Sequence, residues 1–151
     1  MAANAWQVFD VFYDGVGGEV HNLNATDVVK MALILSTWTP NLQTDVTFSV
    51  VDAYEHAALY GYTAGGNAVA ATWDATTNTL KFDVADTVWT AAGGSITARY
   101  ALLYNTAAPT AVNDLIAYCL MDNTPANVTA TDGNTLTVTV NASGVFTIAQ
   151  A

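Results

Sequence analysis

The stretch that decides the fold class is residues 96–104, ITARYALLY. Side chains along a β-strand point alternately to its two faces, and here both faces are largely apolar. A strand that is apolar on both faces lies inside a sheet that is covered on both sides. We therefore expect residues 96–104 to form a central strand, with residues 115–122 as a strand of the same kind.

Working outward, further short apolar or β-branched runs are bounded by clusters of Gly, Asn, Asp and Pro, the pattern of a sandwich or barrel. Residues 68–73 and 79–83 are expected to pair as a hairpin around the loop 74–78, and Trp89 and Thr90 precede the loop 91–95. The remaining predicted strands are residues 7–13 (closed by a turn at 14–18), 30–36 and 47–51, and a C-terminal hairpin of 135–140 and 145–148 around the turn 141–144. The run 30–36 could also be a turn of buried helix, since periodicity alone does not separate the two.

One short helix is predicted after the third of these strands. Asp52 can serve as its N-cap, with Glu55 three residues later as in a capping box. Residues 53–60 then give about two helical turns, and Gly61 is suited to end them. A β-strand remains the alternative for this segment.

These elements predict an all-β protein: an antiparallel β-sandwich of jelly-roll or Ig-like kind with one short helix. The length of 151 residues fits one domain, spanning residues 1–151, and no fixed-period repeat interrupts it. Residues 1–9 are apolar and lightly charged, and we expect residues 2–9 to form an N-terminal arm that reaches onto a partner.

The composition narrows the classes of partner. Hydrophobic residues make up 52% of the chain, but charged residues make up only 11%, against about 25% in typical domains. The net charge is −10, because 13 acidic residues face only Lys30, Lys81 and Arg99. Nucleic acid and anionic membranes would repel such a chain. The expected partner is a protein, a glycan or a neutral surface.

Motifs for catalysis or metal binding are absent from the sequence. His21 and His56 stand in no zinc-binding pattern, and Cys119, the only cysteine, lies in an apolar run typical of a core. Asp83 and Asp86, like Asp10 and Asp14, sit where Asp usually makes local hydrogen bonds. We expect a non-enzyme with no catalytic residue, no cofactor and no metal. The first ten residues have no signal-peptide pattern, and no stretch is a candidate membrane helix, so the expected product is soluble and made in a cytoplasm.

Several residues are expected to have structural roles. Gly61, Gly65 and Gly66, within GYTAGG, lack the lysine of a phosphate-binding loop and predict a turn with positive φ. Arg99 stands in the middle of the central strand, where a charge needs a partner. The candidate partners are Asp83, Asp86 and Asp122.

The four tryptophans, Trp6, Trp38, Trp73 and Trp89, fall at or near predicted strand ends. They could fill the core, anchor a subunit interface, or stack on sugars in a glycan-binding module. The interface candidates are Trp6, Phe9, Trp38 and Trp89.

Four motifs, spread between Gly61 and Ile148, also carry a family resemblance. They are GYTAGG from Gly61 to Gly66, DTVW from Asp86 to Trp89, SITARYA from Ser95 to Ala101, and NASGVFTI from Asn141 to Ile148. In these motifs the chain resembles a group of small structural proteins of tailed bacteriophages. It departs from the group in the spacing of DTVW, in the helical character of residues 53–60 and in the low charge of residues 104–114.

The resemblance implies a virion structural protein of all-β fold with no catalytic residues. We expect a capsid cement or decoration protein that bridges major capsid protein subunits on the capsid surface, assembles as a homotrimer and is made in the host cytoplasm. A tail or head–tail accessory protein is the alternative that the same motifs allow. A carbohydrate-binding or adhesin module is the alternative that the tryptophans allow.

Overall fold

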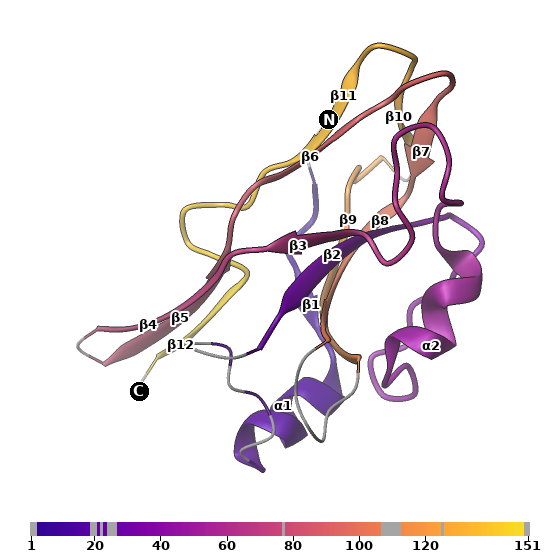
Figure 1. Ribbon diagram of the computed structural model, residues 1–151. Coiled ribbons are helices and arrows are strands. Elements are labelled where there is room, and N and C mark those ends of the chain that lie inside the picture. Colours follow the sequence, from indigo (N-terminus) through magenta and orange to yellow (C-terminus); the bar gives the residue numbers. More distant parts are fainter. Residues whose placement is uncertain are drawn as a thin grey trace.

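The computed structural model describes residues 3–18, 21, 23, 27–76, 78–106, 113–124 and 126–149, and its strands are antiparallel throughout (Figure 1). The helical segments are α1 (Asp10–Gly17), α2 (Phe48–Val51) and a 3-10 turn, η1 (Asp52–Tyr54). The strands are β1 (Gln7–Val8), β2 (Val29–Ile34), β3 (Asn67–Val69), β4 (Ala71–Thr76), β5 (Thr79–Val84), β6 (Thr87–Thr90), β7 (Ile96–Ala98), β8 (Tyr100–Asn105), β9 (Asp114–Leu120), β10 (Val128–Ala130), β11 (Thr135–Val138) and β12 (Phe146–Ala149). The predicted all-β, sandwich-like class is confirmed.

The largest sheet has the strand order β1-β9-β8-β2-β3. In its centre, Leu102 of β8 lies opposite Ala32 of β2 on one side and Tyr118 of β9 on the other. A register shift between Leu103 and Tyr104 bends β8. The predicted central position of this segment and of residues 115–122 is confirmed.

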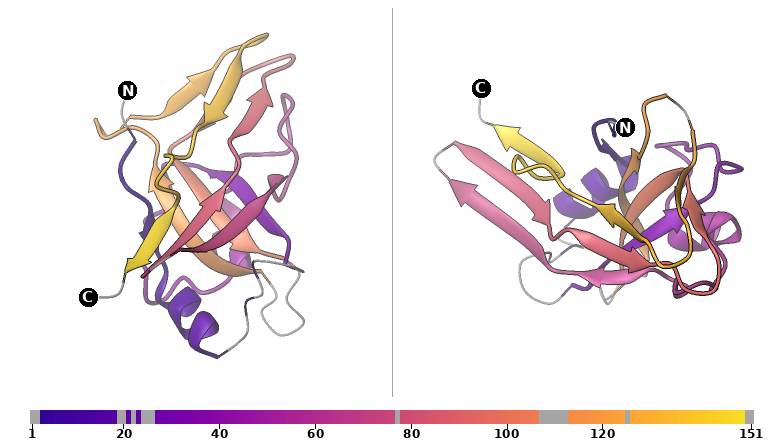
Figure 2. Two further views of the ribbon diagram at one scale, coloured as in Figure 1. Left: turned by 90° about the vertical axis from the view of Figure 1, so that its left-hand side faces the viewer. Right: turned by 90° about the horizontal axis from the view of Figure 1, so that it is seen from above.

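Smaller sheets with the orders β12-β5-β4, β11-β6 and β10-β7 form the second layer (Figure 2). Ala70 alone separates β3 from β4, and Arg99 alone separates β7 from β8. These two segments therefore carry the chain directly from the large sheet into the smaller ones.

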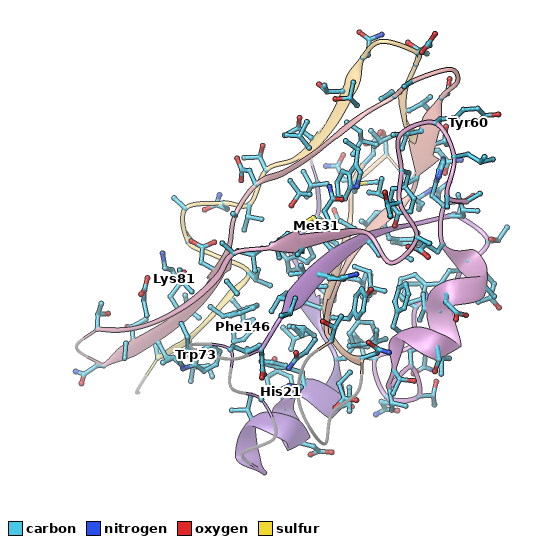
Figure 3. The ribbon with its side chains drawn as sticks, viewed as in Figure 1. His21, Met31, Tyr60, Trp73, Lys81 and Phe146 are labelled. Carbon is cyan, nitrogen blue, oxygen red and sulfur yellow. The ribbon has the colours of Figure 1, made fainter. Side chains whose placement is uncertain are left out.

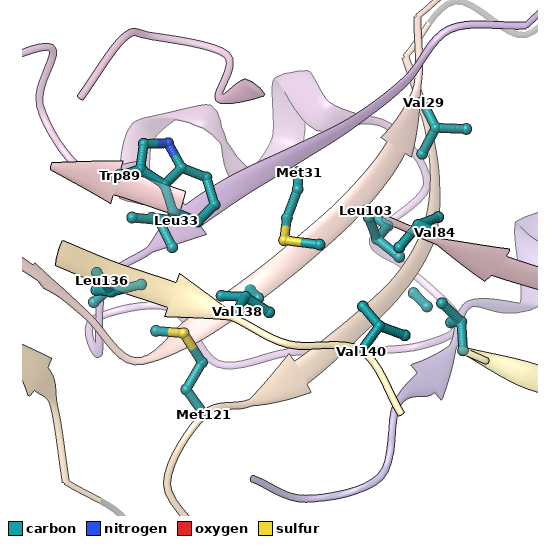
Figure 4. Close-up of a cluster of buried hydrophobic side chains, with 14 of the residues drawn as sticks. Val29, Met31, Leu33, Val84, Trp89, Leu103, Met121, Leu136, Val138 and Val140 are labelled. Carbon is teal, nitrogen blue, oxygen red and sulfur yellow. The ribbon is translucent and has the colours of Figure 1, made fainter. Parts of the chain in front are cut away.

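Both faces of the large sheet are buried, which explains the apolar character of its strands. On β2, Val29, Met31 and Leu33 belong to the inner cluster, the hydrophobic core between the layers, where they pack with side chains of β6, β8 and β11 (Figure 4). The alternate residues Ala32 and Ile34 belong to the outer cluster on the opposite face. Phe9, Trp38, Val51, Leu102, Tyr104 and Leu115 complete this outer cluster.

The prediction of one strand over residues 96–104 needs a correction at Arg99. The Arg99 N–H donates to the Ile34 carbonyl, and the Met121 N–H donates to the Arg99 carbonyl. Its half-exposed side chain donates from Nε to Asn127 Oδ1 at 3.0 Å. The predicted buried ion pair is wrong, because a guanidinium that reaches solvent needs no carboxylate partner.

The prediction of strands at residues 7–13 and 47–51 is wrong for most of their length. Only Gln7–Val8 pair as a strand, and the chain then turns into α1, which places Phe9 in the outer cluster and Phe12 in the inner cluster. The predicted turn at 14–18 lies largely within that helix. Residues 48–51 form α2 instead of a strand.

The predicted helix over residues 53–60 is also wrong, because only η1 is helical there. Glu55 forms a β-bridge with Ile34, and the His56 N–H donates to the Leu33 carbonyl. The chain is therefore extended along β2, and this tertiary pairing overrides the local capping signal.

The predicted C-terminal hairpin does not form, although its turn does. The Gly144 N–H donates to the Asn141 carbonyl at 2.7 Å, but β11 pairs with β6 and β12 pairs with β5. The turn therefore carries the chain from one sheet to the next. The other predicted hairpin, β4 with β5, is confirmed, with its pairing extended to Thr76 and Thr79.

The predicted N-terminal arm is wrong from residue 4 onward. The Asn4 N–H donates to the Leu120 carbonyl, and β1 pairs with β9. Phe9 is fully buried in the outer cluster. The first two residues lie outside the described part of the chain.

Among the described residues, no helix has the length and apolar character needed to cross a membrane.

Candidate functional site

An open groove of about 810 Å³ lies beside the N-terminal segment. Residues 3–6 line it on one side, and residues 136–139 of β11 and its continuation line it on the other. Cys119, Met121 and Val128 contribute further lining side chains. Figure 2 shows the N-terminal segment and the C-terminal strands running along the same side of the molecule.

The alternation of β11 explains how a core strand can also line a groove. Leu136 and Val138 point into the inner cluster, whereas Thr137 and Thr139 are exposed. The core beside the groove is less tightly closed than the core elsewhere. Val138 and Met121 keep 8% and 9% of their surface, whereas Met31 and Leu103 keep none.

The lining is uncharged and offers no reactive group. Burial raises the pKa of the Cys119 thiol to about 11, and its Sγ–H donates to the Asn4 carbonyl at 3.2 Å. A thiol with that pKa is protonated at neutral pH, and the thiolate is the nucleophilic form. The Cys119 thiol is therefore a poor nucleophile at neutral pH.

Only one of the four predicted interface residues lies at this groove. Trp6 lines it and is half-buried. Phe9, Trp38 and Trp89 keep 0%, 3% and 2% of their surface, so the prediction of interface anchors is wrong for these three. Their rings fill the two hydrophobic clusters, and Trp38 Nε1 also donates to Asp45 Oδ2 at 3.2 Å.

Trp73 is packed in a way that disfavours sugar stacking. It is half-buried, and its ring meets Phe82 at 55° and Phe146 at 74° (Figure 3). A glycan platform needs a free aromatic face, and here neighbouring rings occupy the space around the indole. This arrangement points to packing as the role of Trp73.

The predicted turn of GYTAGG is confirmed in its backbone. Gly61, Gly65 and Gly66 have φ values of 89°, 81° and 67°. A Cβ on Gly66 would collide with the Met31 carbonyl, and one on Gly61 would collide with the Thr90 carbonyl. Both glycines are therefore required by close backbone contacts.

A polar network holds this turn against β2. Glu55 Oε1 accepts hydrogen bonds from the Tyr62 hydroxyl at 2.6 Å and from the Gly65 N–H at 2.7 Å. The Tyr62 oxygen accepts the Leu33 N–H at 3.1 Å, and the Tyr104 hydroxyl donates to the Gly65 carbonyl at 2.7 Å. Burial is the main cause that raises the pKa of the Tyr62 hydroxyl, and Glu55 raises it further. The same two causes raise the pKa of Tyr104 to about 12. Sequence reasoning missed this network because Glu55 was interpreted as part of a helix cap.

The histidines have structural surroundings. His56 is buried, and its Nδ1 lies 2.7 Å from the Ala57 carbonyl. His21 stacks on Phe12 with ring centroids 5.0 Å apart, and its Nδ1 lies 3.0 Å from Asn105 Nδ2. Burial lowers the pKa of His21, partly offset by nearby carboxylates. In the part of the chain that the structure describes, no group of three His, Cys, Asp or Glu residues is placed to hold a metal ion.

The carboxylates near the groove make local hydrogen bonds. Asp86 Oδ1 accepts the Val140 N–H at 2.9 Å, and Asp83 Oδ2 lies 3.3 Å from Lys81 Nζ. Asp122 Oδ1 accepts from both the backbone N–H and the hydroxyl of Thr124, and these bonds are the main reason its pKa is lowered. The Arg99 charge lowers it a little further.

Comparison of the chain with protein-family models, with curated proteins and with solved structures found no match.

Proposed function

We propose that the chain is a non-catalytic structural protein of a bacteriophage virion, which binds to the assembled capsid as a cement or decoration protein. The observation that carries the proposal is the uncharged groove of about 810 Å³ between the N-terminal residues 3–6 and β11. Such a site suits the binding of another polypeptide, and the motif resemblance supplies the phage context.

The surface chemistry supports a protein partner. The net charge of −10 disfavours DNA, and a protein on the outside of a capsid is kept apart from the DNA within. With a charged share of 11%, the polar part of the surface is expected to consist mostly of hydroxyl, amide and backbone groups. Such groups lose less on desolvation than ions do, which favours permanent contacts.

The proposed mechanism is stabilisation by linkage. A protein that binds only the assembled shell lowers the free energy of that shell relative to its free subunits. The chain would do so by bridging neighbouring major capsid protein subunits, as a homotrimer placed where they meet. The buried area needed for a stable contact, about 800 Å² on each partner, is within reach of a chain of this size.

The chemistry of the described residues supports a non-enzymatic role. The Cys119 thiol is protonated at neutral pH and hydrogen-bonded, and Glu55 accepts two hydrogen bonds. His56 is buried in the body of the fold. These groups have structural partners in place of substrates.

Gold-labelled antibodies against the purified chain, applied to particles released from cells that carry its gene, test the proposal. Labelling spread over the heads is the expected result. Labelling restricted to tails or to the head–tail junction would support the accessory alternative instead. Particles without label, in a preparation where the chain is expressed, would contradict a virion role.

Light scattering of the purified chain at neutral pH tests the oligomeric part of the proposal separately. A mass three times 15.8 kDa is expected. A monomeric mass at all concentrations would contradict the trimer. The chain would then contact the capsid as a monomer.

A further inference from the structure

One side of the groove is formed by β11, which has β6 as its one paired neighbour among the described strands. The other side is formed by residues 3–6, which lead into β1, the last strand of the five-stranded sheet. The free edge of a strand presents N–H and C=O groups that can pair with another extended chain. An edge that borders an apolar groove is therefore a template for strand addition.

The lining defines what can enter the groove. Trp6, Met121, Leu136 and Val138 give it apolar surface, and its threonine, serine and asparagine side chains are polar but uncharged. A charged side chain placed there would lose hydration without gaining an opposite charge. The best fit is an extended segment whose apolar and threonine side chains alternate.

The distribution of charge indicates which kind of protein supplies the segment. Lys81 is held by Asp74 and Asp83, and Arg99 donates to Asn127, so these cations already have local partners. Asp86, beside the groove at Val140, is exposed. The net charge of −10 would attract a basic protein, and Asp86 places part of that negative charge beside the groove.

We propose that the groove binds an extended, uncharged segment of a basic partner protein, which adds as a β-strand between residues 3–6 and β11. The proposal deepens the function proposed above, and it rests on that function only for the identity of the partner. The homotrimer contacts proposed above would use another surface.

Nuclear magnetic resonance of the full-length, ¹⁵N-labelled chain tests the binding. The probe is a synthetic peptide of about eight alternating threonine and valine residues, the length of a strand with its flanks, with lysines at both ends. We expect saturable shifts of the amides of Ala5, Trp6, Thr137 and Thr139, with the amides of β8 unchanged. A peptide with prolines in place of alternate valines lacks the required N–H groups and should not bind.

Two variants of β11 provide a matched comparison. Thr135 and Thr137 are both exposed and lie on the same face of the strand, but only Thr137 lines the groove. Thr137→Lys places a charge in the groove and should weaken peptide binding about tenfold or more. Thr135→Lys makes the same change in net charge and should bind like the parent chain. The amide spectrum of each variant shows directly whether it is folded.

Several outcomes would overturn the proposal. Shifts scattered outside the groove, or equal losses in the two variants, would contradict the site. Shifts of the groove amides on raising protein concentration without peptide would show that a second copy occupies it. Equal binding of a peptide flanked by glutamates would contradict the basic partner. Each of these results is independent of whether gold-labelled antibodies find the chain on phage heads.

Discussion

The two faces of the large sheet differ in how completely they are closed. The outer cluster is sealed by Phe9, Trp38 and Val51, and each of its buried side chains keeps 3% of its surface or less. The inner cluster is equally tight at Met31 and Leu103 but loosens toward the groove, where exposure reaches 9%.

We infer from this difference that the fold separates stability from the proposed binding. On the outer face, α2 supplies Val51 to the cluster and packs Phe48 against it. The inner face is closed by short strands in two- and three-stranded sheets, which leave edges unpaired on one side. The sealed face is expected to supply most of the folding free energy, and the open side is expected to supply the contact surface.

Gly66 provides the largest expected effect, because it lies against β2 on the sealed part of the sheet. Its φ is 67°, and an added Cβ would collide with the Met31 carbonyl. We expect Gly66→Ala to lower the free energy of unfolding by about 4 kcal/mol. Gly133 has a φ of 79° with no atom within 4 Å of an added Cβ, so Gly133→Ala should cost only about 1 kcal/mol. Urea denaturation measures both, and similar losses in the two variants would contradict the close contact at Gly66.

A matched pair of leucines compares the two sides directly. Leu102, in the outer cluster, keeps none of its surface, whereas Leu136 beside the groove keeps 4%. Leu102→Ala leaves a cavity that cannot collapse and should cost about 4 kcal/mol, whereas Leu136→Ala opens onto the groove and should cost about 2 kcal/mol. Urea denaturation measures both losses in the free energy of unfolding, provided that its slope against urea concentration is unchanged. Equal losses in the two variants would show that the groove side is packed as tightly as the sealed side.

The Tyr62 hydroxyl joins β2 to the GYTAGG turn. Tyr62→Phe leaves the Leu33 N–H without its acceptor and removes one of the two donors to Glu55 Oε1, so we expect a loss of about 2 kcal/mol. Tyr13 is 53% exposed, and Tyr13→Phe should leave the stability unchanged within error. A Tyr62→Phe variant as stable as the parent would mean that water replaces the hydroxyl at no cost.

Stability should fall as the solution becomes alkaline. Burial raises the pKa of Tyr104 from 10.0 to about 12 and that of Cys119 from 9.0 to about 11. Both groups therefore ionise at lower pH in the unfolded chain than in the folded one. Their contribution to the free energy of unfolding is complete below pH 9 and is lost as pH rises toward 12. The urea concentration at the midpoint of unfolding should fall across this pH range. In the Tyr104→Phe variant, it should fall less steeply with pH above pH 10. An unchanged slope in this variant would contradict the role of Tyr104.

The sequence predicts the central strands well but predicts their partners poorly. Residues 96–104 and 115–122 are apolar on both faces, and that pattern has one physical interpretation. The β-branched and aromatic composition of residues 7–13 favours a strand, whereas only Gln7–Val8 pair as one and Asp10–Gly17 form α1. The pairing of β11 with β6 and of β12 with β5 depends on contacts 45 or more residues away, which local turn chemistry does not encode.

The groove was anticipated only in part. The apolar N-terminal segment and Trp6 were predicted to contact a partner, and both line the groove. The opposite wall is separated from them by more than a hundred residues, so the site exists only through the tertiary fold. The remaining aromatic candidates were misplaced because tryptophans serve cores and interfaces alike.

Hydrogen–deuterium exchange, with and without the lysine-flanked peptide, tests the contrast between the sealed and open sides most directly. In the free chain, we predict slow exchange throughout β8 and markedly faster exchange in residues 3–6 and 136–145. With the peptide bound, only the groove segments should slow, while β8 stays the same. Exchange in the free groove segments as slow as in β8, or a peptide that leaves them unchanged, would contradict the account.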